Sequence, residues 1–86
     1  MVNYRLQKLI LGVVDNQIKD KSFPIVRDTF ERLVKEGATK LQAKKIIGGL
    51  LVENIYNILS ESKEFDEKKY ARDLKTLHYD KADFKE

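Results

Sequence analysis

The first candidate for chemistry is the glycine pair Gly48 and Gly49 in the run KKIIGGLLVENIYNIL. A phosphate-cradling loop places its glycines between a strand and a helix start, and the Walker motif adds Lys-Ser or Lys-Thr after them. Neither feature is present, because the apolar helical pattern around the pair begins upstream and continues to Leu59. The pattern favours two glycines inside a helix, each costing roughly 1 kcal/mol relative to alanine. We expect Gly48 to let a neighbouring helix come close.

The ionisable side chains supply little for catalysis. The chain has one histidine, His78, and no cysteine, which excludes thiol chemistry and thiolate metal sites and leaves a Ser-His-Asp arrangement without support. His78 stands near the end of a predicted helix, where the helix dipole favours a cation. Of the carboxylates Glu61, Glu64, Asp66 and Glu67, the last two fit helix-start roles, and the spacing of a calcium loop is absent. We therefore predict no catalytic residue, no metal, no cofactor and a protein that is not an enzyme.

Two amides fall among apolar residues. Gln17 projects onto the apolar stripe of the first predicted helix, and Asn54 falls between Ile47 and Leu50 on the third. A buried amide needs hydrogen-bond partners. The pair indicates either a polar network that fixes helix register or a polar site for a ligand, and we favour the network.

The elements that position these residues are predicted to be helices. Apolar residues recur at three- and four-residue spacing, no alternating strand pattern occurs and there is one proline. The predicted fold class is all-α, a compact bundle of four helices with the third helix central. A chain of 86 residues fits a single domain, 1–86. The predicted helices span residues 3–20, 23–36, 39–60 and 66–78, followed by a charged tail at 79–86. The pattern leaves open whether Phe84 of this tail docks on the bundle.

Residues at the helix ends carry recognisable signals. Ser22 is the expected cap of the second helix, with Pro24 in its first turn, where a missing N–H costs nothing. Gly37 is expected to end that helix in the left-handed conformation. The capping box TKLQ, Thr39 to Gln42, then opens the third helix.

The start of the fourth helix has its own signals. Asp66 is the expected N-cap, and Phe65 is expected to pack on Tyr70 as a hydrophobic staple. Tyr70 should point inward together with Leu74 and Leu77, which makes this the shortest apolar stripe of the four.

The apolar faces suggest a second copy as partner. The first helix carries one stripe: Leu6, Leu9, Ile10, Val13, Val14 and Ile18. The third carries one arc of Ala43, Ile46, Ile47, Leu50, Leu51 and Ile58, and another of Leu41, Val52, Ile55, Tyr56 and Leu59. Because the fourth helix is short, the second arc is expected to be incompletely covered. An uncovered apolar strip favours a symmetric dimer, so we predict a homodimer interface formed by Leu41, Val52, Tyr56 and Leu59.

Charge and hydropathy restrict the other partners. The net charge of +3 comes from 17 basic and 14 acidic side chains dispersed along the chain, whereas a dedicated nucleic-acid surface gathers its Lys and Arg on one face. No apolar run approaches the ~18 residues of a membrane span, and LILGVV is too short for a signal peptide. We predict a cytoplasmic, non-catalytic module that binds another protein or itself. The alternative is weak nucleic-acid binding through a helix-turn-helix at residues 23–60, with Gly37 in the turn.

The stretches VVDNQIKDKSFPIVRDTFERLVKEGATKLQAKKIIGGLLVENIY and KEFDEKKYARDLKTL resemble a bacterial helical family of unknown function. The shared cues are Gln-Ile ending the first helix, Gly ending the second, Ile-Gly with an acidic residue in the third, and a late Phe-Asp with Tyr. Members of that family carry histidine pairs on the first and third helices, a spacing that suits a metal. The matching positions here are Gln7, Leu11, Leu41 and Lys45. The resemblance therefore implies a fold and no metal-dependent activity.

Overall fold

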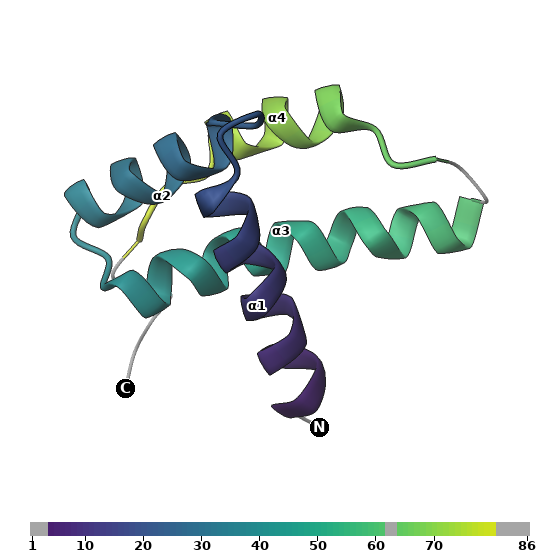
Figure 1. Ribbon diagram of the computed structural model, residues 1–86, viewed down its shortest axis with the longest axis horizontal. Coiled ribbons are helices and arrows are strands. Elements are labelled where there is room, and N and C mark those ends of the chain that lie inside the picture. Colours follow the sequence, from purple (N-terminus) through teal and green to yellow (C-terminus); the bar gives the residue numbers. More distant parts are fainter. Residues whose placement is uncertain (1–3, 62–63, 81–86) are drawn as a thin grey trace.

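The computed structural model describes residues 4–61 and 64–80, which form four helices (Figure 1). The helices are α1 (Tyr4–Lys19), α2 (Ile25–Lys35), α3 (Lys40–Glu61) and α4 (Glu67–Thr76). α3 contacts each of the other three, and the described residues contain no strand. The predicted all-α bundle with a central third helix is thus confirmed. The predicted helix start at residue 3 and the tail beyond residue 80, with Phe84, lie outside the described residues.

The helix-end signals at Gly37, Thr39 and Asp66 are confirmed by hydrogen bonds. Gly37 has a φ of 116°, and the amides of Gly37 and Ala38 turn back to carbonyls of the last turn of α2, as in a Schellman motif. In the capping box, the backbone N–H of Gln42 donates to Thr39 Oγ1 at 3.1 Å, and Gln42 Oε1 accepts from the backbone N–H of Thr39 at 2.9 Å. These bonds hold α2 and α3 at a tight turn.

The fourth helix starts as predicted. Asp66 accepts a hydrogen bond from the backbone N–H of Lys69 at 3.0 Å. The ring of Phe65 lies 5.4 Å from that of Tyr70, centroid to centroid. The cap and the ring contact together direct Tyr70 into the core.

Ser22 does not cap α2, so that prediction is wrong. Its hydroxyl and its backbone N–H both donate to Asp20 Oδ1, at 2.6 and 2.9 Å. A hydrogen bond from the Ser22 hydroxyl to the ionised carboxylate of Asp20 is stronger than a bond from a backbone N–H of α2 to that hydroxyl. Ser22 therefore turns to Asp20 and not to the helix. Pro24 does sit at the helix start, with helical φ −69° and ψ −14°, and no side chain caps this end.

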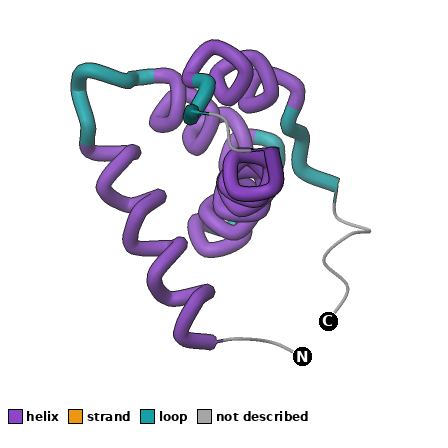
Figure 2. The backbone as a smooth tube through the Cα atoms, turned by 90° about the vertical axis from the view of Figure 1, so that its right-hand side faces the viewer, coloured by secondary structure: helices purple, strands orange, loops and turns teal. Residues whose placement is uncertain are grey.

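α1 crosses α3 steeply near the middle of α3, while α2 and α4 lie together along another side of α3 (Figure 1). Figure 2, which shows α3 nearly end-on, places α1 to one side of it. Gly48 makes this crossing possible, because a Cβ atom there would lie 3.0 Å from Ile10 Cγ2. The expectation that Gly48 admits a close neighbour is confirmed, and the neighbour is α1.

The core lies where the four helices meet. Its fully or almost fully buried apolar residues are Val14, Val26, Leu33, Ala38, Ala43, Ile47, Leu51, Tyr70 and Leu74. Only one of them, Val14, belongs to α1. Because α1 crosses α3 instead of running along it, its N-terminal half projects past the bundle (Figure 1). The apolar stripe predicted on this helix is therefore divided: Ile10 and Ile18 pack on the core, whereas Leu6, Leu9 and Val13 are exposed.

Candidate interaction surface

The four residues predicted to form an interface are all exposed. Leu41, Val52, Tyr56 and Leu59 have 52, 40, 68 and 76% of their surface accessible. They do not form one patch, because α1 crosses α3 at Gly48, between Leu41 and the other three. The reason for their exposure also differs from the one expected. α4 lies with α2 along another side of α3, and the arc is left open because α1 covers only one short stretch of it.

The C-terminal half of α3 and the flank of α1 together form an apolar corner. We define the corner by six exposed side chains: Leu6, Leu9 and Val13 of α1, and Val52, Tyr56 and Leu59 of α3. Leu6 and Val52 line the same hollow. At 100° per residue, Leu9 and Val13 fall within 60° of Leu6 on α1, so they continue its flank. α3 provides the floor of the corner and α1 its wall.

The wall was missed by the sequence reasoning. Leu6, Leu9 and Val13 share the helical period of the core residue Val14, and periodicity alone assigned all of them to one stripe. No signal in the sequence separates them, because the separation depends on the angle at which α1 meets α3. Leu9, 66% exposed, is the clearest case.

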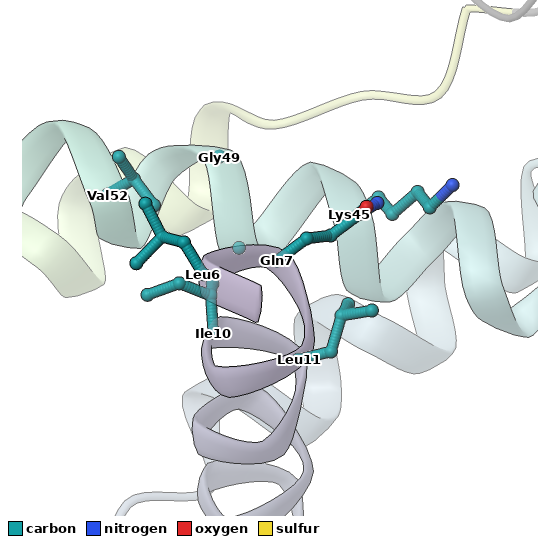
Figure 3. A pocket seen from close by; sticks show the side chains of 8 residues that line it. Leu6, Gln7, Ile10, Leu11, Lys45, Gly49 and Val52 are labelled. Atoms are coloured by element: carbon teal, nitrogen blue, oxygen red, sulfur yellow. The ribbon is translucent and has the colours of Figure 1, made fainter. Parts of the chain in front are cut away.

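Beside the corner, a groove of about 250 Å³ runs between α1 and α3 (Figure 3). Its lining residues are Leu6, Gln7, Ile10, Leu11, Lys45, Gly48, Gly49 and Val52. Apart from its chain neighbours and the backbone of α3 itself, no atom of the described residues lies within 4 Å of the place where a Cβ of Gly49 would be. Packing within the chain therefore explains the absence of a side chain at Gly48 and does not explain it at Gly49.

The groove is polar at one end. Figure 3 shows the side chains of Gln7 and Lys45 reaching the same end, and Leu6 and Val52 lying toward the other. The neighbouring Lys44 pairs with Asp15 of α1, Nζ to Oδ1, at 2.7 Å. Lys45 makes no ion pair with any described residue. The groove thus combines an apolar body with an amide and an unpaired cation.

The two amides singled out in the sequence have separate partners. Gln17 accepts a 2.9 Å hydrogen bond from the hydroxyl of Tyr70 on α4. Asn54 is buried, and its Nδ2 donates to the carbonyl of Leu50 in the same helix at 2.9 Å. Among the described residues, no buried side-chain nitrogen or oxygen lacks a partner. Gln17 therefore joins two helices, while Asn54 closes a bond within α3. Burial raises the pKa of Tyr70 to about 12, so its hydroxyl remains a donor.

A second polar cluster ties the chain after α4 to the end of α2. Glu36 Oε1 accepts from the backbone N–H of Tyr79 at 2.8 Å, and its Oε2 accepts from Arg32 Nη1 at 3.0 Å and lies 3.4 Å from His78 Nδ1. Arg32 Nη2 also donates to the carbonyl of Leu74 at 3.1 Å. The Tyr79 amide, with smaller contributions from His78 and Arg32, holds the pKa of the Glu36 carboxyl below its ordinary value. His78 thus contacts a carboxylate of α2 and lies beyond the end of α4.

No metal centre can be assigned in residues 4–61 and 64–80, because they contain no group of three or more His, Asp and Glu side chains placed to hold an ion. Glu61, Glu64 and Asp66 do line a hollow next to Asn54. Asp66 is engaged as the cap of α4. Within the same described residues, no helix is both long enough and apolar enough to cross a membrane.

The positions matched to the histidines of the resembling family can now be located. Gln7, Leu11 and Lys45 line the groove, and Leu41 lies outside it. Comparison of the chain with protein-family models, with curated proteins and with solved structures gives no match.

Proposed function

We propose that this protein is a non-catalytic interaction module that forms a homodimer through the apolar corner. The observation that carries the proposal is the exposure of six large apolar side chains on two helices that meet at an angle. Monomeric proteins rarely expose contiguous apolar patches of more than a few hundred Å². Fully burying one such side chain is worth ~1.5–3 kcal/mol relative to leaving it exposed. A surface of this kind is stabilised when a partner covers it.

A second copy is the occupant we favour, because each copy presents an apolar floor and an apolar wall that can cover those of the other. In a two-fold arrangement the same patch faces itself, so a residue and its contact appear on both sides. If the C-terminal halves of α3 pair antiparallel around an axis between Ile55 and Tyr56, Val52 faces Leu59 of the second copy. Distances along α3 follow from the rise of about 1.5 Å per residue. The point where α1 crosses, at Gly48, lies ~11 Å from the axis, and the end of the other copy's α3 lies ~8 Å from the axis.

These lengths bring the wall into the interface. A helix with its side chains is about 10–12 Å wide, so the flank of α1 begins ~5–6 Å from the axis and the last turn of the other copy's α3, which reaches ~8 Å, lies against that flank. Leu6, Leu9 and Val13 would contact that end, while Tyr56 packs near the axis. Leu41 lies on the other side of the crossing and has no place in this arrangement. Of the predicted interface, the proposal therefore keeps Val52, Tyr56 and Leu59.

Sedimentation equilibrium across a wide concentration range tests the dimer. We expect a mass that rises from 10.1 kDa towards twice that value as the concentration increases. Tyr56→Glu and Leu9→Glu, one on the floor and one on the wall, should each leave a monomer with an unchanged helical circular dichroism spectrum. Leu41→Glu is the matched control, an exposed leucine of α3 outside the corner, and should still dimerise. A mass that stays at the monomer value up to high concentration would contradict the proposal. So would a dimer that Leu41→Glu abolishes while Tyr56→Glu and Leu9→Glu leave it intact.

The helix-turn-helix alternative stays a prediction. In this reading α3 would enter the major groove of DNA with its N-terminal half. Of the three lysines there, Lys44 is paired with Asp15 and Lys45 lines the groove against α1. No observation favours this function over self-association, and retention of the protein on one DNA sequence at physiological salt would reverse the order.

A further inference from the structure

The groove over Gly49 has features that self-association through the corner does not use. In the antiparallel arrangement above, Glu61 of the other copy faces Leu50, so Gly49 lies about one residue past the end of that helix. A glycine in a helix interior costs roughly 1 kcal/mol relative to alanine. At Gly48 the close approach of Ile10 accounts for that cost, whereas at Gly49 there is open space. The exposed backbone of Gly49 is the floor of the groove, where an occupant can approach more closely than a side chain would allow.

The lining of the groove defines the chemistry of that occupant. Leu6, Ile10 and Val52 surround the floor with apolar surface, and the gap between the helices is about 250 Å³. An unbranched alkyl chain can lie along an apolar groove of this size. The apolar end excludes a ligand that is polar throughout.

The other end is complementary to a negative charge. Lys45 lies at that end, makes no ion pair with any described residue, and has the amide of Gln7 beside it (Figure 3). A carboxylate is complementary to both, because it accepts from an ammonium and from an amide NH₂. A ligand with an apolar chain and one terminal carboxylate therefore satisfies both ends at once.

We propose that this groove binds a medium-chain aliphatic carboxylate, with the alkyl chain over Gly49 and the carboxylate at Lys45 and Gln7. The site is on the surface of one protomer and does not depend on the dimer. It shares Leu6 and Val52 with the edge of the corner, so the ligand and a second copy are neighbours.

The test uses decanoate, below the concentration at which it forms micelles, added to ¹⁵N-labelled protein and followed by NMR. We expect saturable shifts of the amide signals of residues around Gly49, with few changes in α2 and α4. Decanol, with the same chain and no charge, should bind more weakly than decanoate.

Two pairs of variants separate the two ends of the site. Lys45→Met should weaken decanoate roughly fivefold, the range of an exposed ion pair, and should abolish its preference over decanol. Lys44→Met is the control, since Lys44 pairs with Asp15. Gly49→Leu fills the floor and should abolish binding of both compounds. Gly12→Leu makes the same change at another open helix position, on α1 outside the groove, and should leave binding intact.

Three results would overturn the proposal. The first is a linear response without saturation, or shifts spread over all four helices. The second is decanoate affinity that Lys45→Met and Gly49→Leu leave unchanged in correctly folded protein. The third is binding that is seen only at concentrations where the protein dimerises, which would show that the site depends on the second copy.

Discussion

The hydroxyl of Tyr70 on α4 donates a 2.9 Å hydrogen bond to Oε1 of Gln17 on α1, across 53 residues of sequence. The ring of Tyr70 is fully buried, and Phe23 stacks on it at 6.2 Å between centroids. This bond links the first helix to the last. Of the two amides predicted to lie in the core, Gln17 makes a long-range hydrogen bond within the described residues, whereas Asn54 bonds inside its own helix.

Tyr70→Phe should lower the free energy of unfolding by about 1 kcal/mol, the usual net value of such a bond. Gln17→Leu removes the same bond from the other side. If the bond accounts for both losses, the double variant should lose less than the sum of the single variants. Urea denaturation of the four proteins measures this, and strictly additive losses would mean that the two side chains act independently.

The pKa of Tyr70 also predicts a loss of stability at high pH. Burial raises this pKa from 10.0 in the unfolded chain to about 12 in the folded protein. Above pH 10 the unfolded state releases the proton first, so the contribution of Tyr70 is complete below pH 10 and is lost as pH rises towards about 12. The difference in unfolding free energy between the natural protein and Tyr70→Phe should shrink over that window. A difference that stays constant would contradict the assignment.

Asn54→Leu should change the free energy of unfolding by less than about 1 kcal/mol, in contrast to Gln17→Leu. The acceptor of the Asn54 side chain is the carbonyl of Leu50, which in an α-helix also accepts from the backbone N–H of residue 54. Removing the amide therefore leaves no buried acceptor without a partner. Denaturant melts decide between this result and a loss of 2 kcal/mol or more, which would point to a partner beyond α3.

The two adjacent glycines should respond differently to alanine. Gly49→Ala should raise the free energy of unfolding by about 0.5–1 kcal/mol, because helix propensity improves and no atom lies near the new Cβ. Gly48→Ala gains the same propensity but places its Cβ 3.0 Å from Ile10 Cγ2, on a β-branched side chain that is stiff. It should gain less or lose stability. Equal gains for both variants in urea melts would show that α1 does not cross at Gly48.

Acid should release the chain after α4 from α2. The pKa of Glu36 lies below its ordinary value of 4.5, mainly because its carboxylate accepts from the Tyr79 amide. The stabilisation is present above pH 4.5 and is lost as pH falls through the lowered pKa. The amide signal of Tyr79 followed by NMR should titrate in that range, and Glu36→Gln should abolish the step. Glu31→Gln, the same change on α2, should leave it in place; a step at or above pH 4.5 would exclude Glu36 as its source.

The amino-acid sequence by itself determined most of the local structure of this protein, with the exception of Ser22, which bonds to Asp20 instead of capping α2. The left-handed Gly37, the reciprocal bonds of Thr39 and Gln42 and the cap at Asp66 each involve residues within a few positions of one another. Such bonds need no tertiary contact to be recognised. The same holds for the two apolar faces of α3, because the helical period shows which residues share a face.

The tertiary structure alone decided what covers each face. Periodicity placed Leu9 and Val14 in one stripe, yet one is exposed and the other is completely buried. The difference arises from the steep crossing of α1 at Gly48, which also created the corner and the groove. The partner of Gln17 was equally undetermined, since Tyr70 is brought to it by the packing of α4 and not by sequence spacing. A repeating pattern defines the direction of a side chain on its own helix, and only the packing of helices against each other determines what that side chain meets.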